Sequence, residues 1–165
     1  MKLLTTTIAA VLAILAAPVS AQDSSTIVSA ENPEGVAAAL SLVGYSADLK
    51  KDDVGDPLIV TELAGFVAHI YFYDCDDATR LNCQSIRLST GFDRKEAWNA
   101  DEALSMSKKF RFAAVLLDDE GDPYIQWDII TGEGIPMPVF LTSIRRFEST
   151  VQSVSRVVFE EERAD

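Results

Sequence analysis

Carboxylates are the only side chains in this sequence that gather densely enough to suggest chemistry. They occupy two acidic turns, whose aspartates are Asp52, Asp53 and Asp56 in the first and Asp118, Asp119 and Asp122 in the second. Hard oxygen ligands of this kind suit calcium, and two neighbouring carboxylates can serve as acid and base in a hydrolase. Aspartate and glycine also form tight turns for conformational reasons alone. The pattern therefore favours acidic surface turns, with calcium binding and hydrolysis as alternatives.

The sequence contains no other catalytic constellation. Its single histidine, His69, falls in a segment with strand periodicity, where a lone histidine is usually a surface or packing residue. It has no G-x-S-x-G, no H-E-x-x-H and no glycine-rich phosphate loop. We therefore expect a protein that is not an enzyme and that carries no cofactor.

The charge balance excludes several classes of partner. The chain has 165 residues, with 26 acidic against 14 basic side chains and a formal net charge of −12 at pH 7. A nucleic-acid-binding protein needs a basic surface, and anionic membranes attract basic segments, so neither partner is expected. With 48% apolar residues, the chain is long enough and apolar enough to form one domain with its own core.

The N-terminus has the three-part layout of a secretory signal peptide. A basic start at Lys2 precedes an apolar run from Leu3 to Ala17, and the small residues Val19 and Ala21 fit a cleavage site. The apolar run is about 15 residues, shorter than the roughly 20 that a membrane-spanning helix needs. We therefore expect cleavage after Ala21, a periplasmic or secreted protein, and no membrane insertion once the peptide is removed.

The segment after the cleavage site is polar and precedes the first helical pattern. Residues 22–32 include Asp, Ser and Glu, a composition that predicts a flexible lead-in. Pro33 then begins an apolar pattern of helical period. The sequence therefore predicts a signal peptide over 1–21, a lead-in over 22–32 and a single domain over 33–165.

Cys75 and Cys83 are the only cysteines, and they enclose a short acidic segment. Two nearby cysteines in an exported protein usually form a disulfide. A zinc site would need two further nitrogen or sulfur ligands, and only His69 is available. A redox pair usually has the C-x-x-C spacing. We expect a structural disulfide between Cys75 and Cys83, with the zinc and redox sites as weaker alternatives.

Hydrophobic periodicity predicts a run of helices and strands. Segments of helical period lie over 33–43, 93–109 and 138–163, the second with Asp93 as its N-cap. Segments of strand character lie over 45–49, 57–60, 66–73, 85–92, 112–117 and 123–130. The order α-β-β-β-β-α-β-β-α, with strands in runs, predicts an α+β fold in which helices pack on one face of an antiparallel sheet.

The last predicted helix carries a narrow apolar stripe. Its members step by four and three residues: Phe140, Ile144, Phe147, Val151, Val154 and Val158. A helix of this length would lie across a whole small sheet. The stripe also fits a dimer seam, although it is short for a coiled coil. The sheet interpretation is favoured.

Alternation along the predicted strands gives the sheet two unlike faces. One face is apolar, with residues such as Ile70, Ile86 and Ile125, and must lie under the helices. The other face mixes aromatic and polar side chains, namely His69, Tyr71, Tyr73, Arg87, Tyr124, Gln126 and Asp128. This composition is typical of a protein-binding surface, and it equally fits an ordinary half-exposed sheet whose side chains pair across strands.

Several short motifs follow one another in a characteristic order. They are Gly44-Tyr45, Asp53-Val54-Gly55-Asp56-Pro57-Leu58-Ile59, Ile70-Tyr71-Phe72-Tyr73-Asp74-Cys75-Asp76-Asp77, Cys83, Gly91-Phe92-Asp93, Arg111-Phe112 and Leu117-Asp118-Asp119-Glu120-Gly121-Asp122-Pro123. Their order resembles the exported branch of the YbjN-domain family of bacterial proteins, over residues 36–130. The family commonly has Trp-Asn shortly before Arg-Phe, where this chain has Met106-Ser107; here Trp98-Asn99 lies earlier.

The resemblance implies a fold similar to that of type III secretion chaperones, an α+β domain that binds partner proteins and often dimerises. Members of this branch carry a signal peptide and the same pair of cysteines. The family has no established reaction, so the resemblance transfers no catalytic residue, and its proposed roles are regulatory or chaperone-like. We therefore expect a chaperone-like or regulatory domain whose partner is another protein or a second copy of the chain.

Overall fold

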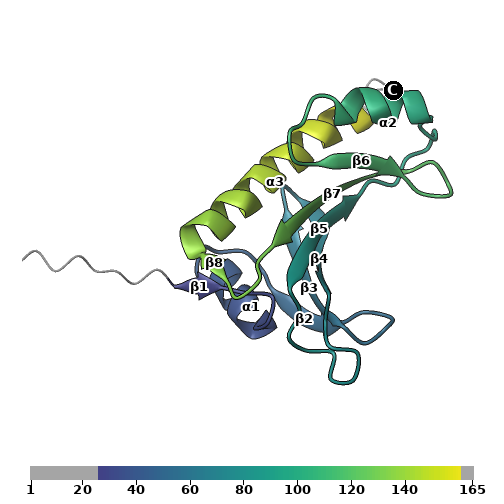
Figure 1. The fold of residues 1–165 in the computed structure, drawn as a ribbon. Coiled ribbons are helices and arrows are strands. Elements are labelled where there is room, and N and C mark those ends of the chain that lie inside the picture. The colour runs from purple at the N-terminus through teal and green to yellow at the C-terminus, as the bar shows by residue number, and fades with distance from the viewer. Residues whose placement is uncertain (1–25, 161–165) are drawn as a thin grey trace, which may run out of the picture.

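A six-stranded antiparallel sheet with helices on one side dominates the computed structural model, which describes residues 26–160 (Figure 1). The strand order is β2-β3-β4-β5-β7-β6, and β1 and β8 form a separate short pair. The elements are β1 (Ile27–Val28), α1 (Pro33–Ser41), β2 (Asp48–Lys51), β3 (Pro57–Leu63), β4 (Phe66–Tyr73), β5 (Ser85–Gly91), α2 (Ala100–Ser107), β6 (Ala114–Leu117), β7 (Pro123–Ile130), β8 (Ile135–Pro136) and α3 (Met137–Val158). The α+β class with an antiparallel sheet is therefore confirmed.

Helix α3 runs along the apolar face of the sheet and closes the core (Figure 1). All members of its apolar stripe are fully buried: Phe140, Ile144, Phe147, Val151, Val154 and Val158. The stripe meets inward side chains of the strands, as in the edge-to-face contact between Phe147 and Trp127, whose ring centroids are 6.4 Å apart. The interpretation that this helix packs on its own sheet is confirmed, so the stripe is not a dimer seam.

The central strands alternate between buried and accessible side chains. Ile70 and Phe72 of β4 and Ile86 and Leu88 of β5 are fully buried, while the residues between them are exposed or half-buried. Antiparallel sheets with one covered face show this period of two. The two unlike faces predicted from the sequence are therefore present.

The second helix is shorter than predicted, because α2 begins at Ala100 and not at Asp93. Asn99 is the N-cap, and its side chain accepts a hydrogen bond from the backbone N–H of Glu102. The Glu102 side chain in turn accepts from the Asn99 N–H at 2.8 Å, which completes a capping box. The prediction of a helix over 93–109 is thus wrong in its first half.

Residues 93–98 are held by the second acidic turn instead. The Arg94 N–H donates to Asp122 Oδ1 at 3.0 Å, and the Trp98 N–H donates to the Gly121 carbonyl at 3.0 Å. Trp98 is also buried against the core. Because these contacts join segments far apart in the chain, they override the local helical pattern.

The first strand of the sheet begins later than predicted, at Asp48 rather than Tyr45. The Tyr45 hydroxyl donates to Glu148 Oε2 on α3 at 2.7 Å. Burial, and then the hydrogen bond and charge of Glu148, raise the pKa of Tyr45 to about 12. Glu148 Oε1 also accepts from the Ala64 N–H at 3.3 Å, so one carboxylate ties α3 to two loops.

Part of the polar lead-in predicted over 22–32 is ordered against the domain. Its residues Ile27 and Val28 form β1, which pairs with β8, and Val28 is almost fully buried. The Ala30 N–H donates to Thr131 Oγ1 at 2.9 Å, a contact between residues 101 positions apart in the sequence. Composition alone does not reveal this pairing, because the partner strand lies near the start of α3.

The signal peptide predicted over residues 1–21, with cleavage after Ala21, lies outside the described residues and stays a prediction. Within residues 26–160, none of the helices combines the length and the apolar character needed to span a bilayer.

Candidate functional site

No helix covers the sheet face opposite α3 in the described part of the chain (Figure 1). We call this surface the open face. It consists of the side chains that alternate with the core residues of four strands: Leu58, Val60, Glu62, Val67, His69, Tyr71, Tyr73, Ser85, Arg87, Ser89, Tyr124, Gln126, Asp128 and Ile130. All seven side chains predicted to bind a partner lie on this face.

The strand register arranges these side chains in rows across the sheet. Tyr71 pairs with Arg87, and Arg87 pairs with Asp128. The neighbouring row runs from His69 through Ser89 to Gln126. Directly opposed side chains in antiparallel strands contact one another, so the sheet assembles these residues into one continuous surface.

Two neighbouring side chains hold Arg87 in one orientation on the open face. Its guanidinium donates to Asp128 from two nitrogens, Nε to Oδ1 at 2.7 Å and Nη2 to Oδ2 at 3.1 Å. It also lies over the Tyr73 ring, 5.0 Å from the centroid. The hydrogen bonds to Asp128 raise the pKa of Arg87, so its guanidinium is charged at any physiological pH. A bidentate pair stacked on a ring is oriented before any partner arrives.

Aromatic rings continue from Arg87 along β4. The ring centroids of His69 and Tyr71 are 5.7 Å apart, and those of Tyr71 and Tyr73 are 6.5 Å apart. Partial burial, followed by the charge of Lys50, lowers the pKa of His69, so the imidazole is neutral at pH 7. The open face therefore presents a ladder of largely uncharged rings beside one ion pair.

Sequence reasoning missed the aliphatic part of the open face. Ile130 is 81% exposed and Val67 is 58% exposed, while Leu58 and Val60 are half-buried. The strand alternation already places these residues outward, and that signal could have identified them. Exposed aliphatic side chains next to aromatic ones are characteristic of surfaces that bind other proteins.

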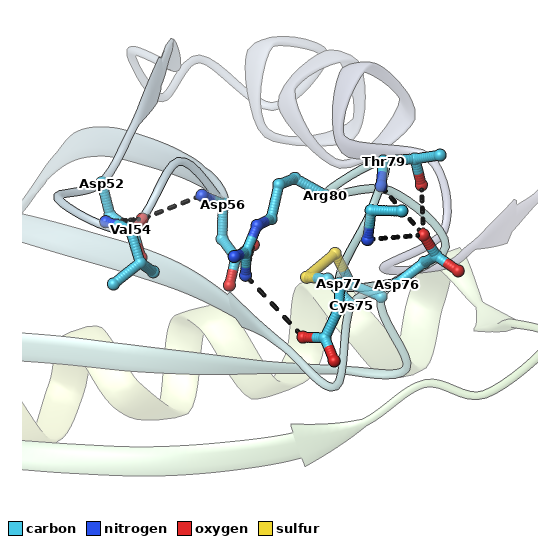
Figure 2. Close-up of polar contacts among 10 residues, drawn as sticks. Asp52, Val54, Asp56, Cys75, Asp76, Asp77, Thr79 and Arg80 are labelled. Atoms are coloured by element: carbon cyan, nitrogen blue, oxygen red, sulfur yellow. Dashed lines mark hydrogen bonds and ion pairs between the residues drawn. A yellow bond between two sulfur atoms is a disulfide. The ribbon is translucent and has the colours of Figure 1, made fainter.

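The leading aspartate of each acidic turn accepts hydrogen bonds from its own turn, and Figure 2 shows the first of the two turns. Asp52 Oδ1 accepts from the Val54 N–H at 3.0 Å and from the Asp56 N–H at 2.9 Å. Asp118 Oδ1 accepts in the same way from Glu120 and Asp122, both at 2.9 Å. The leading aspartate of each turn thus stabilises the turn itself.

Arg80 joins the first acidic turn to the loop between the cysteines (Figure 2). Its Nη1 lies 3.5 Å from Asp56 Oδ1 and 4.0 Å from Asp77 Oδ1. Asp56 Oδ1 is buried and accepts no hydrogen bond within the described residues, so the guanidinium compensates its charge. This carboxylate is therefore engaged in a structural ion pair.

Calcium is expected to leave the stability of the protein unchanged. Among residues 26–160, no three His, Cys, Asp or Glu side chains converge on a point that could hold a metal ion. A true site at a hundredfold excess over its Kd would add about 2.7 kcal/mol, which raises the melting temperature by several degrees. Thermal melts with excess calcium and with a chelator measure this. A rise that Asp52→Asn abolishes would favour the calcium alternative.

The structure places Cys75 and Cys83 together at the base of the β4–β5 loop, with their Sγ atoms within bonding distance. The register explains the placement: Tyr73 pairs with Ser85, so two residues further along each strand Cys75 faces Cys83. The pair is compatible with the disulfide predicted from the sequence.

The loop between the cysteines is stabilised by one of its own aspartates. Asp76 Oδ1 accepts from the backbone N–H groups of Ala78 and Thr79 and from the Thr79 hydroxyl, at 2.9–3.0 Å. The Thr79 hydrogen bonds and then that of Ala78 lower the pKa of Asp76. The loop is therefore a folded turn that presents acids to solvent.

One cavity with acids in its lining lies beside α2 and α3. It has a volume of about 550 Å³ and includes Asp101 and Glu102 in its lining. A pair of catalytic carboxylates needs two unlike environments. Both of these acids are exposed on the first turn of α2, and Glu102 is committed to the capping box. Both acids lie where they stabilise the N-terminus of α2.

Comparison with known proteins identifies one family. A family model named YbjN and described as "Putative bacterial sensory transduction regulator" matches residues 32–160, well over half of the chain. The search of curated proteins found no match to the chain. The matched segment contains the six-stranded sheet and all three helices, and its description names a regulator and no reaction.

Proposed function

The chain belongs to the YbjN family, and on that premise we propose that it is a regulatory protein that acts by binding another protein on its open face. The row formed by Tyr71, Arg87 and Asp128 is the observation that carries the proposal. It combines preorganised polar groups with aromatic area, the combination found at the centres of protein interfaces. The regulatory role described for the family is compatible with binding and requires no catalytic residue.

The energetics of the open face support a protein partner over bare solvent. Ile130 and Val67 are large aliphatic side chains left in water, and covering such area contributes roughly 25 cal/mol per Å². The Arg87–Asp128 pair is formed in advance, so a partner need not order these side chains. Together these features favour a large, mixed interface over a small-molecule pocket.

The surrounding charge defines the chemistry of the partner. The whole chain carries a formal net charge of −12. Burial raises the pKa of Tyr71 most, followed by the charge of Tyr73 and then by the charges of Asp52 and Asp53. The negative field of the first acidic turn therefore reaches the open face. Arg87 is already neutralised by Asp128. The partner therefore presents apolar side chains flanked by lysine or arginine, and salt slows its association.

We further propose that the protein works outside the cytoplasm, as a periplasmic or secreted protein. The signal-peptide layout of residues 1–21 supports this. So does the cysteine pair, because disulfides persist in oxidising compartments.

A photo-reactive amino acid at Ser89 is expected to crosslink the partner in living cells. Ser89 lies between His69 and Gln126 at the middle of the open face. The matched probe is at Gln152, which is exposed on α3 and so lies on the helix side. Crosslinked bands are identified by mass spectrometry, and the partner is expected from Ser89 alone.

The crosslink from Ser89 should also depend on the central row. Tyr71→Ala combined with Arg87→Ala removes two side chains at the centre of the proposed interface. Truncating a central aromatic or arginine side chain typically weakens binding by about 2 kcal/mol or more. Arg146→Ala, an exposed arginine on α3, is the control. Equal capture from both probes contradicts the proposal. So does an undiminished Ser89 crosslink in a Tyr71/Arg87 variant that melts like the original protein.

A further inference from the structure

A cavity of about 420 Å³ lies on the helix side of the sheet, between α3 and the loop that joins α2 to β6. The loop contributes residues 109–113 to the lining, and α3 contributes Arg146 and three hydroxyl side chains. Trp127 of β7 also lines the cavity, and it alternates along the strand with the open-face residues Gln126 and Asp128. The cavity is therefore separated by the sheet from the surface proposed to bind a protein. Its volume is in the range of sites that bind small molecules.

The charge of this cavity is opposite to that of the protein as a whole, and we call it the cation pocket. Three cations line it, namely Lys109, Arg111 and Arg146, while no aspartate or glutamate of residues 26–160 does. The whole chain has a formal net charge of −12. None of the three cations forms an ion pair with an acid of the described segment. Because like charges gathered without a counterion repel one another, the cation pocket favours an anion from outside the chain.

The two arginines differ from Lys109 in their surroundings. Lys109 also borders the cavity beside α2, whose lining includes acids, whereas Arg111 and Arg146 do not. A guanidinium can donate two parallel hydrogen bonds to a carboxylate or a phosphate. Two arginines from separate segments match a phosphate monoester better than a single carboxylate, because the phosphate carries nearly two charges and has three acceptor oxygens. The arrangement therefore favours a phosphate group as the charged part of a ligand.

Aromatic rings line the cation pocket next to these arginines. The Phe112 ring stacks on Trp127, with the ring centroids 5.0 Å apart, and 61% of Phe112 is exposed. The Arg111 guanidinium lies 5.1 Å from the centroid of the Phe112 ring. Trp127 is also in edge-to-face contact with the buried Phe147, which helps to hold it in place. An exposed ring beside an arginine is a surface on which a flat ligand group can stack.

The loop that carries Arg111 and Phe112 is fixed by hydrogen bonds to the end of α2. The Ser107 hydroxyl accepts from the Val115 N–H at 2.8 Å and donates to the Val115 carbonyl at 3.0 Å. The Phe110 N–H donates to the Ser107 carbonyl at 3.2 Å. A ligand therefore meets a loop that is already folded, which lowers the entropic cost of binding.

We propose that the cation pocket binds a small phosphorylated compound with a flat ring, of the nucleoside monophosphate class. Arg111 and Arg146 bind the phosphate, and the ring packs on Phe112 beside Trp127. This site is independent of the protein partner proposed for the open face. The open-face variants test the partner, and variants of the two arginines test the ligand. Arg146→Ala should accordingly leave the Ser89 crosslink unchanged while it weakens ligand binding.

Titration of the purified full chain with adenosine monophosphate tests the proposal. This compound should quench the fluorescence of Trp127 and bind at least about tenfold more tightly than adenosine or inorganic phosphate, since each of these lacks one of the two contacts. Isothermal titration calorimetry measures the same affinities without relying on fluorescence. The chain has 2 tryptophans, and Trp98 lines the cavity beside α2 instead. Trp98→Phe should therefore preserve the quenching.

Arginine variants locate the phosphate. Arg111→Ala and Arg146→Ala should each weaken the binding of adenosine monophosphate by about tenfold or more, because each removes a charged hydrogen-bond donor. The matched control is Arg145→Ala, since Arg145 is an exposed arginine of α3 that does not line the cation pocket. This change should leave the affinity unaltered. All three arginines are exposed, so the variants should fold like the original protein, which circular dichroism checks.

Three results would overturn the proposed ligand site. One is a protein that binds none of the three probes at millimolar concentration. The second is binding of adenosine or of inorganic phosphate as tightly as that of adenosine monophosphate, since ring and phosphate would then not be recognised together. The third is an affinity that Arg111→Ala and Arg146→Ala leave undiminished, or quenching that Trp98→Phe abolishes in a folded variant, because the ligand would then occupy another site.

Discussion

Replacing Phe147 with alanine is expected to lower the free energy of unfolding by about 3–5 kcal/mol. Phe147 is fully buried in the middle of α3, edge-on to Trp127 beneath the sheet. Losing the ring removes its burial and leaves a cavity that a rigid helix and sheet cannot close. Because domains are stable by only about 5–15 kcal/mol, a large part of the total is at stake. Urea unfolding followed by circular dichroism measures the loss.

The control for Phe147→Ala lies further along the same helix, on its exposed side. Gln152 is exposed, and Gln152→Ala should change stability by no more than about 0.5 kcal/mol. If the stripe held two chains together, the loss in Phe147→Ala would vary with protein concentration. A loss below about 1 kcal/mol at an unchanged m-value would remove Phe147 from the core.

Removing the Cys75–Cys83 link is expected to cost about 2.5 kcal/mol on the chain-entropy model for a loop of this size. The two cysteines lie 8 positions apart in the sequence and close the long loop between β4 and β5. Without the link, the unfolded chain regains the freedom of that loop. The double variant Cys75→Ala/Cys83→Ala should therefore unfold at lower urea than the original protein.

Reduction supplies the matched control for the cysteine variant. A thiol reductant should lower the stability of the original protein by the same amount and leave the double variant unaffected. The intact mass of the original protein should be lower than that of its reduced form by two hydrogen atoms. Stability that ignores the reductant in a protein proved to be oxidised would contradict a structural role for the link.

Most elements of the fold could be predicted from local hydrophobic periodicity. The predicted strands over 66–73 and 123–130 coincide with β4 and β7, and the buried stripe of α3 is the predicted one. These elements follow directly from where apolar side chains recur, because burying one face dictates a period of two in strands and 3.6 in helices. The turn at Asp52 could be predicted equally well, because an aspartate side chain accepts hydrogen bonds from the backbone N–H groups that follow it.

Prediction from periodicity fails where a distant segment competes for backbone groups. Residues 93–98 have a helical pattern, yet Asp122 and Gly121 take the N–H groups of Arg94 and Trp98. Tyr45 has the character of a strand residue but turns to Glu148 on α3. These contacts cannot be predicted from the local sequence, because each depends on which distant segments the folded core brings together.

From the sequence alone, one face of the sheet had to be apolar and the other aromatic and polar, because side chains alternate along a strand. Which residues meet on that second face was decided by the tertiary structure. Arg87 and Asp128 are 41 positions apart and form a bidentate pair only because β5 lies beside β7 in one register. The positions of β2 and β6 at the two edges of the sheet likewise follow from strand order. Strand order depends on the burial of all strands together, which no local pattern contains.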